Sequence, residues 1–338
     1  MDSLTQATLG AAVAVATLGR RTAPWKAALW GALWGTLPDL DAFIDHGDPV
    51  RNMTLHRGDS HALFWLTLAA PLLGALAARL HGEWAHRRRW WFAAWLALVT
   101  HPLLDWMTVY GTQLWRPFTD TPYGLGSIFI IDPLYTVPLL IGLAVALSAG
   151  SAQRWRWNSA GLVLSTAYLG WSAAAQAHVR GVAELALAQQ GIVASQVLVT
   201  PTPFNTVLWR IVAITPQAHH EGFHSLLDPA GAPLHFDRFD RGAALEAPLA
   251  GLWAADRIRW FSRGFYKLSE VDGQARISDL RMGQEPYFTF AFGVARRHGA
   301  GWVPQDRPSA EGGRPSELGP ALRWVWRRML GAPLLPPR

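Results

Sequence analysis

The sequence predicts an α-helical integral membrane domain of about six spans, some of them short, followed by a small antiparallel β-rich soluble domain. Three observations predict this class. Half of the 338 residues are hydrophobic. Only 16% carry a charge, whereas soluble domains carry about 25%. Long apolar runs fill the N-terminal half, and short runs rich in β-formers follow from about residue 180.

The composition excludes several other classes. Disordered chains are poor in apolar residues and rich in charge, unlike this one. The chain has no cysteine, which excludes disulfide scaffolds, thiolate zinc fingers and cysteine nucleophiles. Its 19 tryptophans are typical of membrane interfaces. The net charge of +6 fits basic loops beside membrane spans, so we expect no nucleic-acid partner.

Six apolar runs are candidates for membrane spans, each of which needs about 20 residues. Four of the runs come close to that length. The two that precede them are shorter, and are either short, tilted spans or helices buried between the others. In chain order the runs are Leu4–Leu18, Trp25–Leu37, Leu63–Leu80, Trp90–Met107, Ile128–Ala149 and Ser159–Ala177. The first is predicted to be a retained helix, because its positive charges follow it, whereas those of a signal peptide precede the apolar region.

Basic loops alternate with mixed or acidic loops along this half of the chain. The basic segments are Arg20–Lys26, His81–Arg89 and Ala152–Trp157. The positive-inside rule places such segments in the cytoplasm. Pro38–Ser60 and Thr108–Ser127 would then face outward, and so would everything after the sixth run.

The C-terminal part is predicted to be a β domain. Short runs rich in β-branched and aromatic residues are separated by Pro, Gly and Asp, which favours antiparallel strands. These runs are Val193–Thr200, Thr206–Thr215, Gly222–Leu227, Ile258–Leu268, Ala275–Arg281 and Tyr287–Ala295. We expect a transmembrane domain over residues 1–178, a β-rich domain over 179–303, and a loose linker with a short basic amphipathic helix over 304–338.

The last segment contains two features. Arg307–Pro320 is rich in Pro, Gly and Ser and predicts the linker. After it, Leu322, Val325, Trp326 and Met329 follow helical spacing, with arginines elsewhere on the helix. Such a helix lies either on the membrane surface or on the β domain.

His101 and Asp105 stand inside an apolar run, where an ionisable side chain is costly, about 2.5–3.5 kcal/mol for Asp at mid-membrane. Side chains four residues apart share one face of a helix. An imidazole nitrogen and a carboxylate oxygen placed in this way can bind one metal ion. The alternative is a buried His–Asp hydrogen bond that only holds helices together.

Two polar segments carry the other candidate ligands. His61 would lie in the first turn of a helix, and His56 could approach it if a loop bends at Gly58. Asp39 and Asp41 face the same side of an extended segment, with Asp41 a candidate catalytic carboxylate. The alternatives are a solvated loop for the histidines and a capping turn for the aspartates.

The predicted topology places these side chains in one layer near the outer interface. Histidine and aspartate without cysteine favour zinc as the divalent metal, with manganese also possible. Such an ion activates water and binds a phosphate or other ester oxygen. Arg57 is the candidate to bind a substrate oxyanion. The absence of a Gly-x-Ser-x-Gly elbow argues against a serine hydrolase.

Several motifs resemble one bacterial family, the membrane-bound, metal-dependent hydrolases that include a LexA-regulated inner-membrane protein. The matching stretches are Met1–Ala7, Gly35–Asp41, His56–His61, His101–Asp105, Tyr110–Gln113, Ile131–Tyr135 and Thr200–Asn205. The resemblance is strong over the first half of the chain. It implies a location in the bacterial inner membrane and a distant relation to zinc-dependent phospholipase C and single-strand nucleases.

The resemblance also implies a helical metal site and an activity. Its ligands would be Asp39, His56, His61, His101 and Asp105. The chain departs from the family at Gln6, where many members have histidine. We expect a hydrolase acting on a phosphoester or other ester at the outer face of the membrane, with membrane lipids as partners and no particular oligomeric state predicted.

Two other functions compete with this one. The first is a non-catalytic membrane protein with a structural His/Asp site and a partner-binding β domain. The second is a transporter, against which the missing repeat and the position of the cluster near one face both argue.

Overall fold

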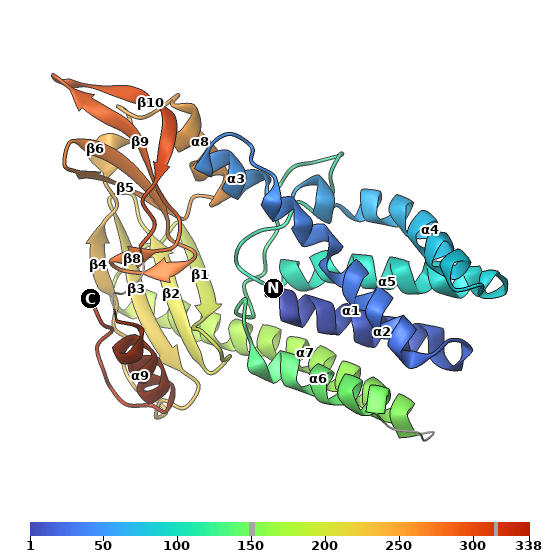
Figure 1. Ribbon diagram of the computed structural model, residues 1–338. Coiled ribbons are helices and arrows are strands. Elements are labelled where there is room, and N and C mark those ends of the chain that lie inside the picture. Colours follow the sequence, from blue (N-terminus) through green and yellow to red (C-terminus); the bar gives the residue numbers. More distant parts are fainter. Residues whose placement is uncertain (149–152, 314–316) are drawn as a thin grey trace. The chain divides into compact units, whose positions relative to one another are not determined.

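The computed structural model describes residues 1–148, 153–313 and 317–338 (Figure 1). The chain divides into two compact units. The first comprises Met1–Ile44, Arg57–Ala173 and Pro203–Asn205, and the second Asp45–His56, Ala174–Thr202 and Thr206–Arg338. The end of the fifth apolar run at Ala149, the start of the basic segment at Ala152 and residues 314–316 of the expected linker lie outside the described residues.

The first unit consists of helices. They are α1 (Ser3–Leu18), α2 (Pro24–Thr36), α4 (Leu63–Leu80), α5 (Arg87–Trp106), α6 (Pro133–Ser148) and the first part of α7 (Gln153–Gln189), with the 3₁₀ turns η1 (Gly19–Arg21), η2 (Leu37–Phe43), η3 (Asp59–His61) and η4 (Trp84–His86). Local sequence explains where the first two begin. Asp2 caps α1 by accepting a hydrogen bond from the Thr5 amide at 3.0 Å. Pro24 begins α2, where its missing N–H has no helical partner anyway.

Glycines allow α1 and α2 to cross in direct backbone contact. A Cβ atom on Gly10 would lie 2.2 Å from the Gly31 carbonyl oxygen and 2.8 Å from the Gly35 Cα. Trp34 and Trp90 pack edge-to-face in the core beside this crossing, with ring centroids 6.1 Å apart. The crossing holds the C-terminal end of α2 in place, and the residues of the candidate site follow this end in the chain.

The prediction of about six membrane spans is wrong. Among the described residues, only α4 is long and apolar enough to cross a membrane. The 16 residues of α1 and of α6 reach about 24 Å at 1.5 Å per residue, less than the ~30 Å hydrocarbon core. Charged residues stand at the start of α5 and α7, Arg87–Arg89 in the first and Arg154 and Arg156 in the second. The ionisable side chain of His101 lies inside α5.

Burial inside the unit explains why these runs are apolar. In α5, Trp90, Ala94 and Leu98 are fully buried against neighbouring helices. Apolar residues packed between helices give the same sequence pattern as a short span. The outward position of the C-terminal part was inferred from six spans, and stays a prediction.

The second unit is β-rich. One sheet has the order β1-β2-β3-β4 and a second the order β10-β9-β6-β5, and all their pairings are antiparallel. The strands are β1 (Gln196–Pro201), β2 (Leu208–Ile214), β3 (Ala218–Ser225), β4 (Asp237–Asp240), β5 (Tyr266–Val271), β6 (Gln274–Asp279), β9 (Ala291–His298) and β10 (Gly301–Ala310), with the small pair β7 (Gly283–Gln284) and β8 (Tyr287–Phe288). The C-terminal part of α7 packs on β1 and β2 through a core that includes Val179, Val199 and Trp209.

In this unit a helix replaces part of one expected strand, and a strand extends into the expected linker. The segment Ile258–Leu268, expected as a strand, contains the end of α8 (Trp253–Phe261) and the start of β5. Ala254, Ile258 and Phe261 are buried at helical spacing, which the aromatic and β-branched composition of the segment concealed. The unit also contains the short helix α3 (Pro49–Leu55) and the terminal helix α9 (Leu318–Met329), while β10 extends to Ala310 within the expected linker.

Candidate metal centre

Four side chains of the first unit converge at one point and could bind a metal ion: Asp39, His61, His101 and Asp105. The Nε2 atoms of the two histidines are 3.1 Å apart. Asp39 Oδ1 lies 3.4 Å from each of these nitrogens. Asp105 Oδ2 lies 3.3 Å from His61 Nε2 and 3.4 Å from His101 Nε2.

These spacings suit a tetrahedral ion. With ligand bonds of about 2.0–2.1 Å, as zinc makes to nitrogen and oxygen, neighbouring ligand atoms stand about 3.3–3.4 Å apart. The distances that involve the two carboxylates match this value, and the distance between the imidazole nitrogens is slightly shorter. The geometry therefore fits zinc, or another small divalent ion that accepts nitrogen and oxygen ligands.

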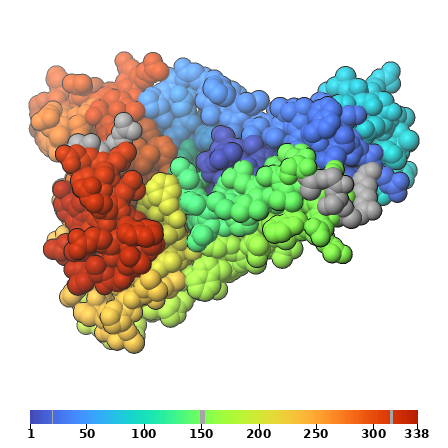
Figure 2. All heavy atoms as spheres, turned by 60° about the horizontal axis from the view of Figure 1, so that its bottom comes forward, coloured from blue at the N-terminus to red at the C-terminus, as the bar shows by residue number. Residues whose placement is uncertain are grey.

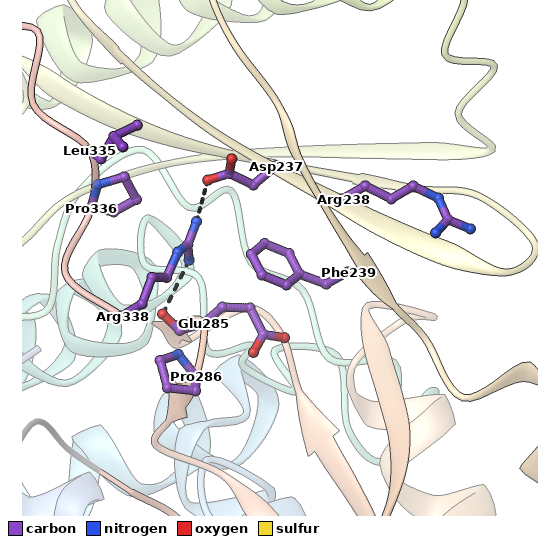
Figure 3. Close-up of a pocket in the computed structure, with 8 residues that line it drawn as sticks. All are labelled: Asp237, Arg238, Phe239, Glu285, Pro286, Leu335, Pro336 and Arg338. Carbon is purple, nitrogen blue, oxygen red and sulfur yellow. Dashed lines mark hydrogen bonds and ion pairs between the residues drawn. The ribbon is translucent and has the colours of Figure 1, made fainter.

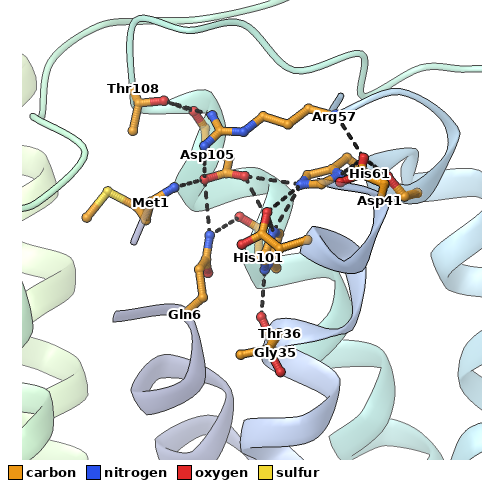
Figure 4. A network of polar contacts seen from close by, with 12 residues as sticks. Met1, Gln6, Gly35, Thr36, Asp41, Arg57, His61, His101, Asp105 and Thr108 are labelled. Atoms are coloured by element: carbon orange, nitrogen blue, oxygen red, sulfur yellow. Dashed lines mark hydrogen bonds and ion pairs between the residues drawn. The ribbon is translucent and has the colours of Figure 1, made fainter. Parts of the chain in front are cut away.

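The two imidazole rings are oriented through their other nitrogens (Figure 4). His101 Nδ1 lies 2.6 Å from the Gly35 carbonyl oxygen at the end of α2. His61 Nδ1 lies 2.9 Å from Ser60 Oγ and 3.6 Å from Asp41 Oδ2. An N–H donated to such an acceptor fixes the tautomer and turns the Nε2 lone pair toward the metal position.

Asp105 is buried and surrounded by donors at one of its two oxygens. Oδ1 receives the Met1 α-amino group, the Gln6 amide at 3.1 Å and an Arg57 guanidinium nitrogen at 3.2 Å (Figure 4). Oδ2 accepts no hydrogen bond from any described residue. A buried carboxylate oxygen without a donor is costly, and a cation at this position would satisfy it.

Arg57 holds a strained backbone conformation beside the cluster. Its φ of +61° is in the left-handed region that favours glycine, at a cost of order 1–3 kcal/mol. Its amide donates to Asp41 Oδ2 at 3.0 Å, and its side chain donates to Thr108 Oγ1 at 3.2 Å. The guanidinium also stacks over Tyr110, 4.9 Å from the ring centroid. The turn is thus tied to the same carboxylate that orients His61.

The electrostatics of the cluster favour positive charge. Burial lowers the pKa of His101, but the neighbouring carboxylates of Asp105 and Asp39 outweigh burial and raise the pKa to about 8. Burial raises the pKa of Asp39, but hydrogen bonds with His101 and His61 hold it well below its ordinary value. At neutral pH the metal-free cluster therefore holds a proton, which an arriving metal ion must displace.

The residues that the sequence singled out have different positions here. Asp39, His61, His101 and Asp105 come together, and Asp41 and Arg57 lie directly beside them. His56 ends α3, in the segment that belongs to the second unit, and is not one of the four. Its role as a ligand stays a prediction, as do the catalytic roles of Asp41 and Arg57.

Sequence reasoning missed the supporting groups. The Gly35 carbonyl, the Ser60 hydroxyl and the Thr108 hydroxyl all contact site residues. In the sequence, Gln6 is only a departure from the family pattern. In the structure, its buried side-chain amide donates hydrogen bonds to Asp105 and to the His101 carbonyl oxygen. Its position at the start of an apolar helix was the signal that could have indicated a buried polar role.

A separate cavity of about 480 Å³ lies within the second unit (Figure 3). It is lined by Asp237, Arg238, Phe239, Glu285, Pro286, Leu335, Pro336 and Arg338. Arg338 crosses it and donates to Asp237 and to the Glu285 carbonyl. None of the candidate metal ligands lines this cavity.

Comparison with known proteins identifies the family. The family model described as YdjM inner membrane protein matches residues 1–179, more than half of the chain. The chain belongs to the YdjM family. The matched region contains all four converging side chains of the candidate site.

A curated relative is similar over part of its length. It is described as the uncharacterized protein YfhP of Bacillus subtilis, 29% identical over 161 residues, which cover 45% of this chain and 48% of that protein. The chain thus spans about half the length of the curated relative it matches. No solved structure matches the chain significantly. These findings support an inner membrane family, and none of them extends the resemblance to hydrolases or to phospholipase C.

Proposed function

We propose that the chain is a membrane-bound, metal-dependent hydrolase that holds a divalent ion, zinc in the first place, between His61, His101, Asp39 and Asp105. The observation that carries this proposal is the set of contacts between two imidazole nitrogens and two carboxylate oxygens, 3.1–3.4 Å long. Asp105 Oδ2 also supports the proposal, because this buried oxygen accepts no hydrogen bond from a described residue and a cation would satisfy it.

The ion would supply a Lewis acid that activates water and polarises an ester or phosphate oxygen. The residues of the chain would do the rest. His61, His101 and Asp105 are fully buried, whereas the Asp39 side chain is 19% exposed. A substrate would therefore reach the metal centre from the side on which Asp39 lies.

Arg57 supports a phosphoester as the substrate. Its terminal nitrogens contact Asp105 and Thr108, while its Nε–H has no hydrogen-bond partner among the described residues. A guanidinium N–H beside the metal position suits a phosphate or carboxylate oxygen. Asp41 would act indirectly, by holding the His61 ring.

A second candidate is a structural metal site in a non-catalytic membrane protein. Four protein ligands are already at tetrahedral spacing and three of them are fully buried. Structural zinc sites have four protein ligands, whereas catalytic sites keep one position open.

One experiment separates the two functions. The full chain is purified in detergent, stripped of metal with a chelator, and assayed on bis(4-nitrophenyl) phosphate before and after zinc or manganese is restored. A hydrolase regains turnover with metal, and Asp39→Asn abolishes it while the exposed control His178→Ala does not. A structural site regains only its melting temperature, and turnover stays absent in every sample.

A further inference from the structure

Helix α9 of the second unit has one face anchored to the β domain. Trp324 is buried and meets the ring of Phe223 edge-to-face, with centroids 4.9 Å apart. Arg328 donates to Asp228 Oδ2 at 2.8 Å and to the Phe223 carbonyl at 3.0 Å. These contacts fix which face of α9 is turned toward the β domain and which face is turned away from it.

The other face presents a stripe of large apolar side chains. Leu318, Leu322, Trp326 and Leu330 are 54%, 46%, 62% and 56% exposed. They are spaced four residues apart, so they form one continuous row on the helix. At about 100° per residue, Trp324 lies opposite the middle of this row. Packing on the β domain leaves the stripe uncovered.

Basic side chains border the stripe. Arg323 and Arg327 are exposed and follow Leu322 and Trp326 directly in sequence. Neither forms an ion pair with a described residue, unlike Arg328. Residues 318–338 include no aspartate or glutamate. In Figure 2 these C-terminal residues, coloured red, form part of the molecular surface.

We propose that α9 docks on an anionic lipid surface, with the stripe of Leu318, Leu322, Trp326 and Leu330 at the acyl boundary and Arg323 and Arg327 among the headgroups. An apolar face that contains Leu and Trp, bordered by Arg, is the pattern of helices that lie in the membrane interface. The occupant is lipid because the arginines complement negative headgroups.

Attachment to the membrane strengthens this contact. The chain belongs to an inner membrane family, and the residues that the structure describes include one candidate span. A helix tethered in this way meets the bilayer at a high effective concentration. A single weak signal gives only marginal binding, whereas two signals together give stable binding. The 12 residues of α9 can therefore dock although a free peptide of this length would bind weakly.

Because the chain has no cysteine, single-cysteine labelling tests the proposal on the whole protein. Leu322→Cys and Trp326→Cys are each labelled with an NBD fluorophore, and the full chain is reconstituted in nanodiscs that contain phosphatidylglycerol. Quencher-bearing lipids should quench most of the fluorescence at both positions. Asp306→Cys, exposed on β10, is the matched control and should keep its fluorescence.

Charge and occupant are tested in the same system. Arg323→Gln with Arg327→Gln should reduce the quenching at the Leu322 label, and discs of phosphatidylcholine alone should reduce it as well. Labels that stay water-accessible and unquenched in anionic discs overturn the proposal. Labels that are shielded equally in detergent, in a chain that has become a dimer, also overturn it and indicate a second copy as the occupant.

Discussion

The Nε2 atoms of His61 and His101 face each other at 3.1 Å across 40 residues of sequence. The Nδ1 atom of each ring contacts an orienting group. Ser60 and Asp41 contact that of His61, and the Gly35 carbonyl contacts that of His101. Two imidazole lone pairs at this distance repel unless a proton or a metal ion lies between them. Two carboxylates beside them favour a cation there, and the same carboxylates raise the pKa of His101 to about 8.

Asp41→Asn should weaken metal binding without abolishing it. Asp41 contacts His61 Nδ1 and the Ser60 hydroxyl, and is not one of the four converging ligands. Loss of such an orienting group costs about 10–100-fold in metal affinity. Zinc titration against a chromophoric chelator measures the change. Asp59→Asn, an exposed carboxylate paired with Arg116, should bind like the unmodified chain, and equal affinity in Asp41→Asn would refute the orienting role.

Arg57 should show two separable effects. Arg57→Ala leaves the buried Asp105 carboxylate without its guanidinium partner, and breaking a buried ion pair costs about 3–5 kcal/mol of unfolding free energy. Arg57→Lys keeps the charge and loses the planar fork, so it should keep bound metal and lose most phosphodiester hydrolysis.

Thermal unfolding and turnover are measured on both Arg57 variants. Arg116→Lys serves as the control, because Arg116 forms a partly exposed ion pair with Asp59. Full activity in Arg57→Lys and in Arg57→Ala would show that Arg57 has no part in the reaction.

Gly10→Ala should destabilise the first unit. The new Cβ would meet the Gly31 carbonyl oxygen at 2.2 Å, and overpacking of this kind costs about 1–3 kcal/mol. Gly170→Ala is the matched control, because a Cβ there meets nothing within 4 Å and alanine favours helix by about 0.5–1 kcal/mol. Melting curves should place Gly10→Ala below the unmodified chain and Gly170→Ala at or above it. The reverse order would contradict the observed crossing of α1 and α2.

Glu285 should make the second unit sensitive to acid. Burial raises its pKa, but hydrogen bonds with His219 and Lys267 outweigh burial and lower the pKa to about 2. A depressed folded pKa adds stability above the ordinary value of about 4.5, and this stability is lost as the pH falls toward 2. Glu285→Gln should therefore melt at a lower temperature than the unmodified chain at pH 7.

The difference between Glu285→Gln and the unmodified chain should shrink as the pH falls below about 4.5. Glu270→Gln, changed in an exposed pair with Arg297, is the control and should show little difference at any pH. If the difference in melting temperature between Glu285→Gln and the unmodified chain is the same at neutral and acid pH, the charge of Glu285 does not stabilise the fold.

Part of the site could be predicted from local spacing. The i, i+4 relation of His101 and Asp105 follows from helix geometry alone. The approach of Asp39 and His61 could not, because it depends on η2, η3 and the crossing of α1 and α2. Gln6 enters the site for the same reason, since α1 packs against α5 in the folded unit.

Other parts of the fold were ambiguous for physical reasons. A helix buried among other helices and a membrane span need the same apolar residues, so the run that became α5 suggested a span. In α8, the spacing of Ile258 and Phe261 was helical, but the aromatic composition suggested a strand. The separation of apolar helices from a β-rich C-terminal region was evident from composition, because it depends on long runs rather than on tertiary contacts.

The proposed function requires that His61, His101, Asp39 and Asp105 hold one divalent ion. The most direct measurement is elemental analysis of the purified, detergent-solubilised chain after exposure to zinc and removal of free metal. We expect about one zinc per chain, with ligand bonds of about 2.0–2.1 Å in X-ray absorption. His61→Ala and His101→Ala should lose the ion while His178→Ala keeps it. A folded chain without stoichiometric metal, or full metal content in both histidine variants, would show that these four side chains do not bind the ion.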